Sequence, residues 1–247
     1  MIDKLVSKLL ARKDYVKVAG STIVASHRRL SGRAFKDDQV YVKSAEGEAN
    51  RLIQRFGFGL ESRVLDVGCG QGRLAIGLLR TLGDVPYIGI DIDQTSIAWC
   101  RDYIERDHPS FKFKHLNAYN ERYNPRGRNI GPGFQFEEDR ESADVAYLFS
   151  VFSHTTERDM RIYLKDFARV LDRNGKVFFT SFVEDNVPNL SINPEHYRLE
   201  CSGPLHIVRY NRPYLFSILD ELGYSILDFT HATEADGQSA IYLEKAI

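Results

Sequence analysis

The sequence predicts an α/β protein with a Rossmann-like, doubly wound sheet of seven strands, mostly parallel and with an antiparallel C-terminal hairpin strand. From Arg63 onward, strand-like apolar runs alternate with helical patterns, which is typical of a parallel sheet with helices on both faces. Near the C-terminus, two strand-like runs flank the turn-rich segment 234–237, which indicates a closing hairpin. The length of 247 residues and the 43% hydrophobic content suit one globular domain.

The apolar spacing predicts each element in order. Residues 2–10 and 45–56 repeat apolar side chains at helical spacing, and the Ser-, Gly- and charge-rich stretch 20–42 between them is expected to be a loop or partly ordered lid. Strands follow at 63–67, 86–91, 111–116, 143–149 and 175–182, helices near 72–82, 94–106, 156–171 and 213–222, and hairpin strands at 224–231 and 238–245. A capping box at Thr156-x-x-Asp159 marks one helix start.

Two segments interrupt the alternation and are candidates for substrate recognition. One is the loop 120–140, which contains glycine and proline, and the other is the insertion 183–211, which holds several polar aromatic residues. Loops longer than ~15 residues in a compact domain are usually functional, and open α/β sheets bind ligands at the carboxyl ends of their strands. We therefore expect a basic N-terminal helix and lid segment, 1–43, and a sheet domain, 44–247, whose insertion 183–211 recognises the substrate.

Composition excludes several classes of protein. No apolar run approaches the ~20 residues of a membrane span, and the N-terminus lacks the pattern of a secretory signal, so we expect a cytoplasmic protein. The three cysteines, Cys69, Cys100 and Cys201, have neither disulfide nor metal-ligand spacing. We expect reduced, mostly buried thiols and no bound metal.

Charge is distributed unevenly along the chain. Residues 1–43 hold ten Lys and Arg against four Asp and Glu, although the whole chain has a net charge of −1. The basic segment is suited to an anionic substrate, to peripheral contact with a membrane surface, or simply to packing on the acidic body, and we favour packing. The near-zero net charge and the lack of a recognisable binding module in the sequence argue against a nucleic-acid partner.

The segment 64–72, Val-Leu-Asp-Val-Gly-Cys-Gly-Gln-Gly, is the main candidate for a ligand site. A buried strand runs into three glycines and then a helix, so the backbone turns sharply and its amides are open to a ligand. Asp66 precedes the first glycine by two positions. Asp91 ends the next strand, 19 residues beyond Gly72, about the spacing at which a carboxylate reaches a ribose.

A nicotinamide dinucleotide is the rival ligand, because Gly68 and Gly70 begin a Gly-x-Gly-x-x-Gly fingerprint. The third position of that fingerprint is Arg73, and a carboxylate at Asp66 would repel a pyrophosphate but attract the ammonium of an amino acid. The ligand that fits is a nucleoside that bears a zwitterionic amino acid and a sulfonium.

At these residues the sequence resembles the class I S-adenosylmethionine-dependent methyltransferases. The likeness rests on 64–72, 89–91, 115–119, 144–150 and 169–178, and spans about residues 45 to 245. It implies S-adenosylmethionine (SAM) as the cofactor. The resemblance places the methionine end at Asp66, Gly68, Cys69 and Gly70, the ribose at Asp91 and Ile92, the adenine at Asn117 and the Ala118 amide, and Ser150 at the edge of the same site. Asn117 departs from the family pattern, in which Asp is common.

The kind of methyl transfer is suggested by the segment after the fourth strand. It lacks the Asn/Asp-Pro-Pro-Tyr run of enzymes that methylate base amino groups, and no Pro-Cys nucleophile suggests carbon-5 pyrimidine chemistry. Instead, 150–154 and 178–182 are similar to bacterial enzymes that O-methylate small molecules, sugars or lipid-linked glycans. We therefore expect a small-molecule or glycan acceptor. The alternatives are an RNA or protein methyltransferase and a cofactor-binding module without catalysis.

His154 is the leading candidate for the general base. It follows Ser150 by four residues at the carboxyl edge of the fourth strand, and an imidazole titrates close to neutral pH. Competing residues in the insertion are His196 and His206, together with Tyr197 and Tyr210. The alternative for His154 is that it caps the helix that begins near Thr156.

Overall fold

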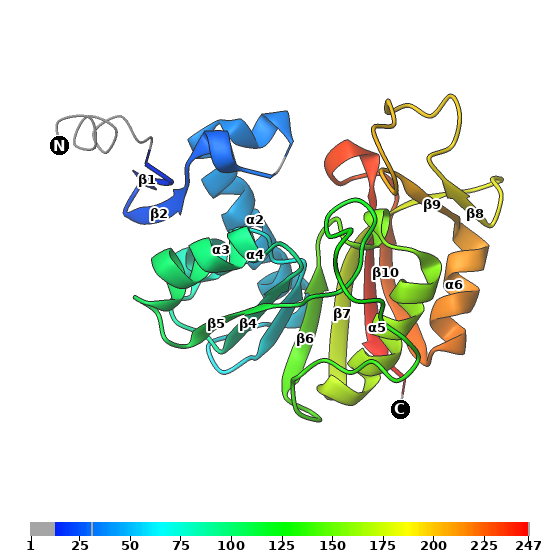
Figure 1. Cartoon of the computed structure of the whole chain (residues 1–247). Coiled ribbons are helices and arrows are strands. Elements are labelled where there is room, and N and C mark those ends of the chain that lie inside the picture. Colours follow the sequence, from blue (N-terminus) through cyan, green and yellow to red (C-terminus); the bar gives the residue numbers. More distant parts are fainter. Residues whose placement is uncertain (1–12, 31, 247) are drawn as a thin grey trace.

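The computed structural model describes residues 13–30 and 32–246, and it confirms the predicted sheet (Figure 1). Seven strands lie in the order β10-β11-β7-β6-β3-β4-β5. Their bounds are β3 (Val64–Val67), β4 (Tyr87–Asp91), β5 (Phe111–His115), β6 (Ala143–Leu148), β7 (Leu171–Glu184), β10 (Tyr224–Thr230) and β11 (Ser239–Lys245). The central strands pair in parallel, and β11 runs antiparallel between β7 and β10, as the C-terminal hairpin predicts.

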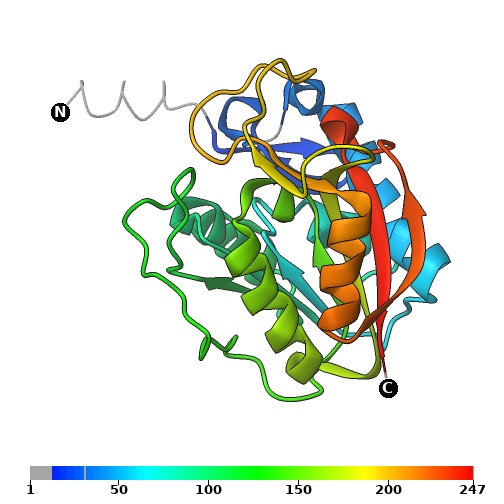
Figure 2. The ribbon, with the colours of Figure 1, turned by 90° about the vertical axis from the view of Figure 1, so that its right-hand side faces the viewer.

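Helices cover both faces of this sheet. The helices are α2 (Asp38–Phe56), α3 (Arg73–Thr81), α4 (Gln94–Cys100), which continues as a π-helical turn over Arg101–Glu105, α5 (Glu157–Val170) and α6 (Arg212–Glu221). Figures 1 and 2 show α5 and α6 on one face, with α2, α3 and α4 on the other. The Thr156 side chain accepts a hydrogen bond from the Asp159 amide and so caps α5, where the sequence predicts a capping box.

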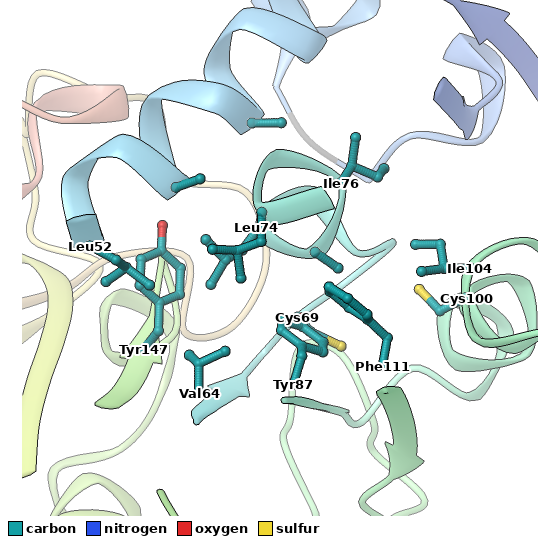
Figure 3. Packing of buried hydrophobic residues seen from close by; sticks show 14 of the residues in the cluster. Leu52, Val64, Cys69, Leu74, Ile76, Tyr87, Cys100, Ile104, Phe111 and Tyr147 are labelled. Atoms are coloured by element: carbon teal, nitrogen blue, oxygen red, sulfur yellow. The ribbon is translucent and has the colours of Figure 1, made fainter. Parts of the chain in front are cut away.

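The alternation of side chains along each strand divides the core into two layers. Tyr147 and Phe178 stack with ring centroids 5.0 Å apart in the layer under α2 and α3, whereas their neighbours Leu148 and Phe179 pack beneath α5. Figure 3 shows part of the first layer. Gly77 lets α3 lie directly on α2, because a Cβ there would be 2.0 Å from the Ala45 carbonyl oxygen.

The N-terminal arm, residues 13–36, differs from the expected loop. It contains a β-hairpin of β1 (Tyr15–Val18) and β2 (Ser21–Val24), followed by two 3-10 turns, and α2 begins at Asp38. The β-branched residues of both strands flank Ala19 and Gly20, whose φ values of 46° and 86° form a two-residue turn. The helix predicted at 2–10 lies outside the described residues.

Several cations of this arm bind the protein itself. Arg28 forms an ion pair with Asp14, and the buried Arg29 forms one with Asp38 at the start of α2. The Lys36 ammonium donates to the Arg29 carbonyl oxygen at 2.7 Å. These three contacts lie within the arm and at its junction with α2. Within residues 13–30 and 32–246, no helix is long and apolar enough to cross a membrane.

The insertion 183–211 is only partly a loop. Its short strands β8 (Leu190–Ile192) and β9 (Val208–Asn211) pair with each other, and β9 extends the sheet in parallel with the end of β7. Val208 and Tyr210 are fully buried there, so this part of the insertion belongs to the core. In Figure 2 the rest of the insertion, drawn in yellow and orange, rises at the same edge of the sheet as the blue arm and the red turn before β11.

Candidate active site

A cavity of about 610 Å³ opens at the carboxyl ends of β3, β4 and β6. Its size is typical of a pocket that encloses a small molecule. Eight of the nine residues expected to bind the cofactor line it, namely Asp66, Gly68, Cys69, Gly70, Asp91, Ile92, Ala118 and Ser150. Two of the three candidate bases, His154 and His206, line it as well. The fold thus gathers residues from distant parts of the sequence around one space.

The glycine loop adopts a conformation that other residues resist. Gly68, Gly70 and Gly72 have φ values of 79°, 51° and 72°, all in the left-handed region. A Cβ on Gly68 would be 2.3 Å from a methyl carbon of Val151. The amides of Gly68 and Cys69 both donate to the Ile90 carbonyl oxygen, at 2.7 and 3.1 Å. These bonds tie the loop to β4, and Gly68, Cys69 and Gly70 line the cavity.

Two backbone amides hold the Asp91 carboxylate in place, and both of its oxygens can still accept hydrogen bonds from a ligand. One carboxylate oxygen accepts the Gly70 amide at 2.7 Å, and the other accepts the Asp93 amide at 2.8 Å. Each carboxylate oxygen accepts about two hydrogen bonds, so each retains one lone pair for a further donor. Burial raises the pKa of Asp91, whereas the two amide donors lower it. This arrangement suits a pair of neighbouring hydroxyl groups.

Asp66 lies on the floor of the cavity and is fully surrounded by protein. Its carboxylate accepts a hydrogen bond from the Tyr87 hydroxyl at 2.6 Å. Burial raises the pKa of Asp66 to about 7, despite the hydrogen bond from Tyr87 that opposes the shift. A cation that enters the cavity next to this carboxyl group would stabilise its ionised form.

Arg73 is a lining residue that the sequence analysis used only to reject a dinucleotide. Its guanidinium lies over the rings of Phe149 and Phe35, 4.4 and 5.2 Å from their centroids, and 3.4 Å from a Glu48 carboxylate oxygen. The sequence did contain a signal for this role of Arg73. The residue directly follows the third glycine of the loop, so it is the first residue of α3 and lies beside the cavity. The cavity therefore offers both a carboxylate, Asp66, and a guanidinium to a zwitterion.

Asn117 is not among the residues that line the cavity, and its expected contact with the adenine stays a prediction. Its side chain is exposed, and its Oδ1 accepts a hydrogen bond from Asn124 at 3.4 Å. The backbone turns tightly after β5, where the Ala118 amide donates to the Leu116 carbonyl oxygen at 2.8 Å. Asn117 lies within this turn, so its neighbours Leu116 and Ala118 line the cavity in its place.

Ser150 is fixed by a closed set of hydrogen bonds in a strained conformation. Its φ of 59° is unusual for a residue with a side chain and marks a constrained position. The Ser150 amide donates to the Thr180 hydroxyl at 2.8 Å, and that hydroxyl donates to Gln238 Oε1 at 2.7 Å. Gln238 Nε2 returns a hydrogen bond to Ser150 Oγ at 2.8 Å. The serine hydroxyl thus has a defined place beside the cavity.

His154 presents one ring nitrogen to Ser150 and the other to the insertion. Nε2 lies 3.4 Å from Ser150 Oγ, and Nδ1 lies 3.1 Å from the Leu205 carbonyl oxygen. A carbonyl oxygen only accepts, so Nδ1 carries the proton and Nε2 has a free lone pair when the ring is neutral. Burial lowers the pKa of His154 to about 4. The ring is therefore neutral near pH 7, and α5 is capped by Thr156, not by His154.

The other candidate bases are less well placed. His206 stacks on His154 with ring centroids 6.2 Å apart, but its Nδ1 accepts the Ser202 amide at 2.8 Å. His196 is exposed and is not among the residues that line the cavity, so the structure does not bring it to the site. Tyr197 donates to Glu184, and Tyr210 is buried behind the site. Of these four residues of the insertion, only His206 lines the cavity.

The end of the cavity near His154 has further walls that the sequence analysis missed. They comprise Arg122 and Tyr123 from the loop after β5, Phe182 from β7, and Leu199 from the insertion. The Tyr123 ring meets His154 edge-on, with centroids 5.8 Å apart. Arg122, Tyr123 and Leu199 belong to the two segments that interrupt the β/α alternation, and that interruption was the only signal for them in the sequence, whereas Phe182 lies at the end of the predicted fifth strand.

Comparison with known proteins finds similarity to methyltransferases. Residues 64–175 match a family model described as a methyltransferase domain. The chain is similar to the O-methyltransferase rstn1 of Aspergillus nomiae, with 25% identity over 209 residues that cover 83% of this chain and 84% of the relative. It is also 26% identical over 148 residues to a ubiquinone biosynthesis O-methyltransferase of Bradyrhizobium diazoefficiens. That match covers 60% of this chain and 47% of the relative.

Solved structures share the fold at low sequence identity. A putative sarcosine dimethylglycine methyltransferase from Galdieria sulphuraria has a TM-score of 0.61 at 15% identity, and the match covers 84% of this chain and 86% of that one. The 1,6-didemethyltoxoflavin-N1-methyltransferase of Burkholderia thailandensis, solved with S-adenosylhomocysteine, has a TM-score of 0.56 at 13% identity, with 95% and 100% covered. Together with the fold and the match over residues 64–175, these similarities identify the chain as a SAM-dependent methyltransferase.

Proposed function

We propose that the enzyme transfers the methyl group of SAM to a hydroxyl oxygen of a small molecule. The observation that carries this proposal is the position of His154, a neutral imidazole whose free Nε2 faces the cavity beside Ser150. Nitrogen and sulfur acceptors need less help with proton removal, whereas an alcohol or phenol benefits from a base within hydrogen-bond reach. The two O-methyltransferase relatives support the same reaction type.

We assign the cofactor to the glycine-loop end of the cavity. Asp91 is suited to accept the two ribose hydroxyls, and Leu116, Ala118 and Val151 form an apolar wall for the adenine. The cofactor's ammonium and carboxylate match Asp66 and Arg73 at the other end. When bound, SAM supplies an electrophilic methyl carbon on its sulfonium.

In the proposed mechanism, the residues near His154 orient the acceptor and take its proton. The acceptor hydroxyl donates to His154 Nε2, in competition with Ser150 Oγ, while the Leu205 carbonyl oxygen keeps Nδ1 protonated. As the acceptor oxygen forms its bond to the methyl carbon and the carbon–sulfur bond breaks, the hydroxyl proton passes to Nε2. Low polarity around His154 then favours release of that proton to solvent after the transfer.

A labelled methyl-transfer screen tests this proposal. The enzyme is incubated with SAM carrying a ¹³C-methyl group and with metabolite, glycan, RNA or protein fractions, and the product methyl is assigned by NMR. We expect an O-methyl signal in the metabolite or glycan fraction. Label that appears only on nitrogen or carbon, or only in RNA or protein, would contradict the proposal. So would cofactor binding with no product from any fraction.

A further inference from the structure

The acceptor end of the cavity contains a cation without an ionic partner. Among the residues that the structure describes, Arg122 is not paired with any carboxylate, although five aspartates line the same cavity. Asp66, Asp91 and Asp93 belong to its glycine-loop end, and the other two are Asp159 and Asp236. Asp159 faces Arg158 at 3.5 Å, and Asp236 is exposed at the rim, where water screens its charge. The Arg122 charge therefore acts on whatever occupies the cavity.

The Arg122 guanidinium has one donor without a hydrogen-bond partner. Nη1 donates to the Ser202 carbonyl oxygen at 2.5 Å and lies 3.4 Å from that of Pro204, which fixes the side chain against the insertion. Nε is buried and has no hydrogen-bond partner. A buried donor without a partner costs free energy that a ligand acceptor would recover. The Nε side of a guanidinium is one of the edges that bind a carboxylate through two parallel hydrogen bonds.

This cation lies one aromatic ring away from the proposed base. The Arg122 guanidinium is 5.4 Å from the Tyr123 ring centroid, and that ring is 5.8 Å from the His154 ring. A molecule that places a hydroxyl at His154 therefore has room to extend along Tyr123 toward Arg122. Leu199 and Phe182 add apolar surface to the lining of the cavity.

We propose that the acceptor carries a carboxylate that binds Arg122 while its hydroxyl lies at His154, as in a hydroxylated aromatic acid. The inference rests on the proposed function, since it names the acceptor of that reaction. A single guanidinium matches one negative charge, and the nearby Asp236 and Asp159 disfavour a dianion such as a phosphate monoester. Arg122 is thus a specificity residue in addition to a link between the loop and the insertion.

Calorimetry on the S-adenosylhomocysteine complex tests the inference without turnover. The probes are 3,4-dihydroxybenzoate and 3,4-dihydroxybenzamide, which differ in the carboxylate. We expect the wild type to prefer the benzoate by about 10-fold or more, the scale of a charged hydrogen-bonded pair. Arg122→Gln should bring the two affinities within about 2-fold, whereas Arg126→Gln, which removes the same charge from an exposed site in the same loop, should keep the preference.

Three results would overturn the carboxylate site. They are failure of the wild type to bind the benzoate, equal wild-type affinity for the two probes, and a preference that survives Arg122→Gln. Unchanged affinity of the variant for S-adenosylhomocysteine shows that it is folded.

A second experiment, methyl transfer to both probes, distinguishes failure of the carboxylate site from failure of the proposed reaction. Equal O-methylation of both, unaffected by Arg122→Gln, contradicts the carboxylate site alone, whereas benzoate binding through Arg122 without O-methylation contradicts the proposed reaction alone.

Discussion

His154 Nε2 lies 3.4 Å from the hydroxyl of Ser150, and the two residues meet from the end of β6 and the turn that follows it. The proton on the opposite nitrogen is held by the carbonyl of Leu205, which belongs to the insertion. The insertion therefore defines the tautomer of the proposed base as well as covering the cavity. A movement of this segment would change both access to the site and the basicity of His154.

Asp91 should control cofactor affinity through the ribose. We expect Asp91→Ala to weaken binding of S-adenosylhomocysteine by about 10-fold or more, as for a lost charged hydrogen bond. Asp91→Asn keeps one acceptor oxygen, so its loss should be smaller. Calorimetry measures both affinities. Melting temperatures check that the variants remain folded after the loss of acceptors for the Gly70 and Asp93 amides. An unchanged dissociation constant in Asp91→Ala would refute the assignment.

Asp66 should make cofactor binding depend on pH. Its raised pKa of about 7 means that the carboxyl group must ionise to bind an ammonium, so affinity for S-adenosylhomocysteine should fall as the pH drops below 7. Between pH 8 and pH 6 the fall should approach about 10-fold. 5′-Methylthioadenosine has the same nucleoside without the amino acid and should show no such change. The same pH dependence in Asp66→Asn would argue against this role.

The tip of the insertion should be needed for transfer and dispensable for cofactor binding. Asn193 closes its base by bonding the Gly203 carbonyl oxygen and the Ile207 amide, each at 2.9 Å. Replacing 195–202 with two glycines therefore removes Leu199 but spares the buried strand β9. We expect turnover to be lost and affinity for S-adenosylhomocysteine to be nearly unchanged. Parallel loss of both would mean that the tip is structural.

The lowered pKa of His154 should make the folded protein less stable at acidic pH. Its folded pKa of about 4 lies below the ordinary 6.5, so the unfolded chain binds more protons between these values, and stability must fall as the pH drops from about 6.5 toward 4. The full effect is at most about 3 kcal/mol. His154→Gln lacks this titration, so its free energy of unfolding, measured in urea from pH 7 to pH 5, should decline less steeply than that of the wild type. Identical slopes would contradict the shift.

The glycine-loop end of the cavity could be predicted because its signals are local in the sequence. The glycine loop and the acid that ends the next strand follow from strand–turn–helix order, and parallel strands bring Asp66 and Asp91 to the same sheet edge. The two-residue turn at Ala19 and Gly20 carried a hairpin signal that the composition of the arm obscured.

The acceptor half depends on how two long loops fold against each other. Sequence spacing does not tell whether His196 or His206 turns inward, because the insertion has no regular periodicity. The same holds for Arg122, whose position is determined by carbonyl oxygens 80 and 82 residues away. Asn117 lies outside the lining of the cavity because a tight turn at the strand end places Leu116 and Ala118 there instead.

The rate of the chemical step in His154 variants tests the central claim most directly. With an acceptor found in the labelled screen, single-turnover methyl transfer is compared in the wild type, His154→Ala and His154→Gln at pH 7.5, with cofactor affinity as the folding control. A general base predicts a loss of about 100-fold or more in both variants with cofactor affinity unchanged. Rates within a few-fold of the wild type in both variants, or full recovery with glutamine, would contradict general-base catalysis by His154.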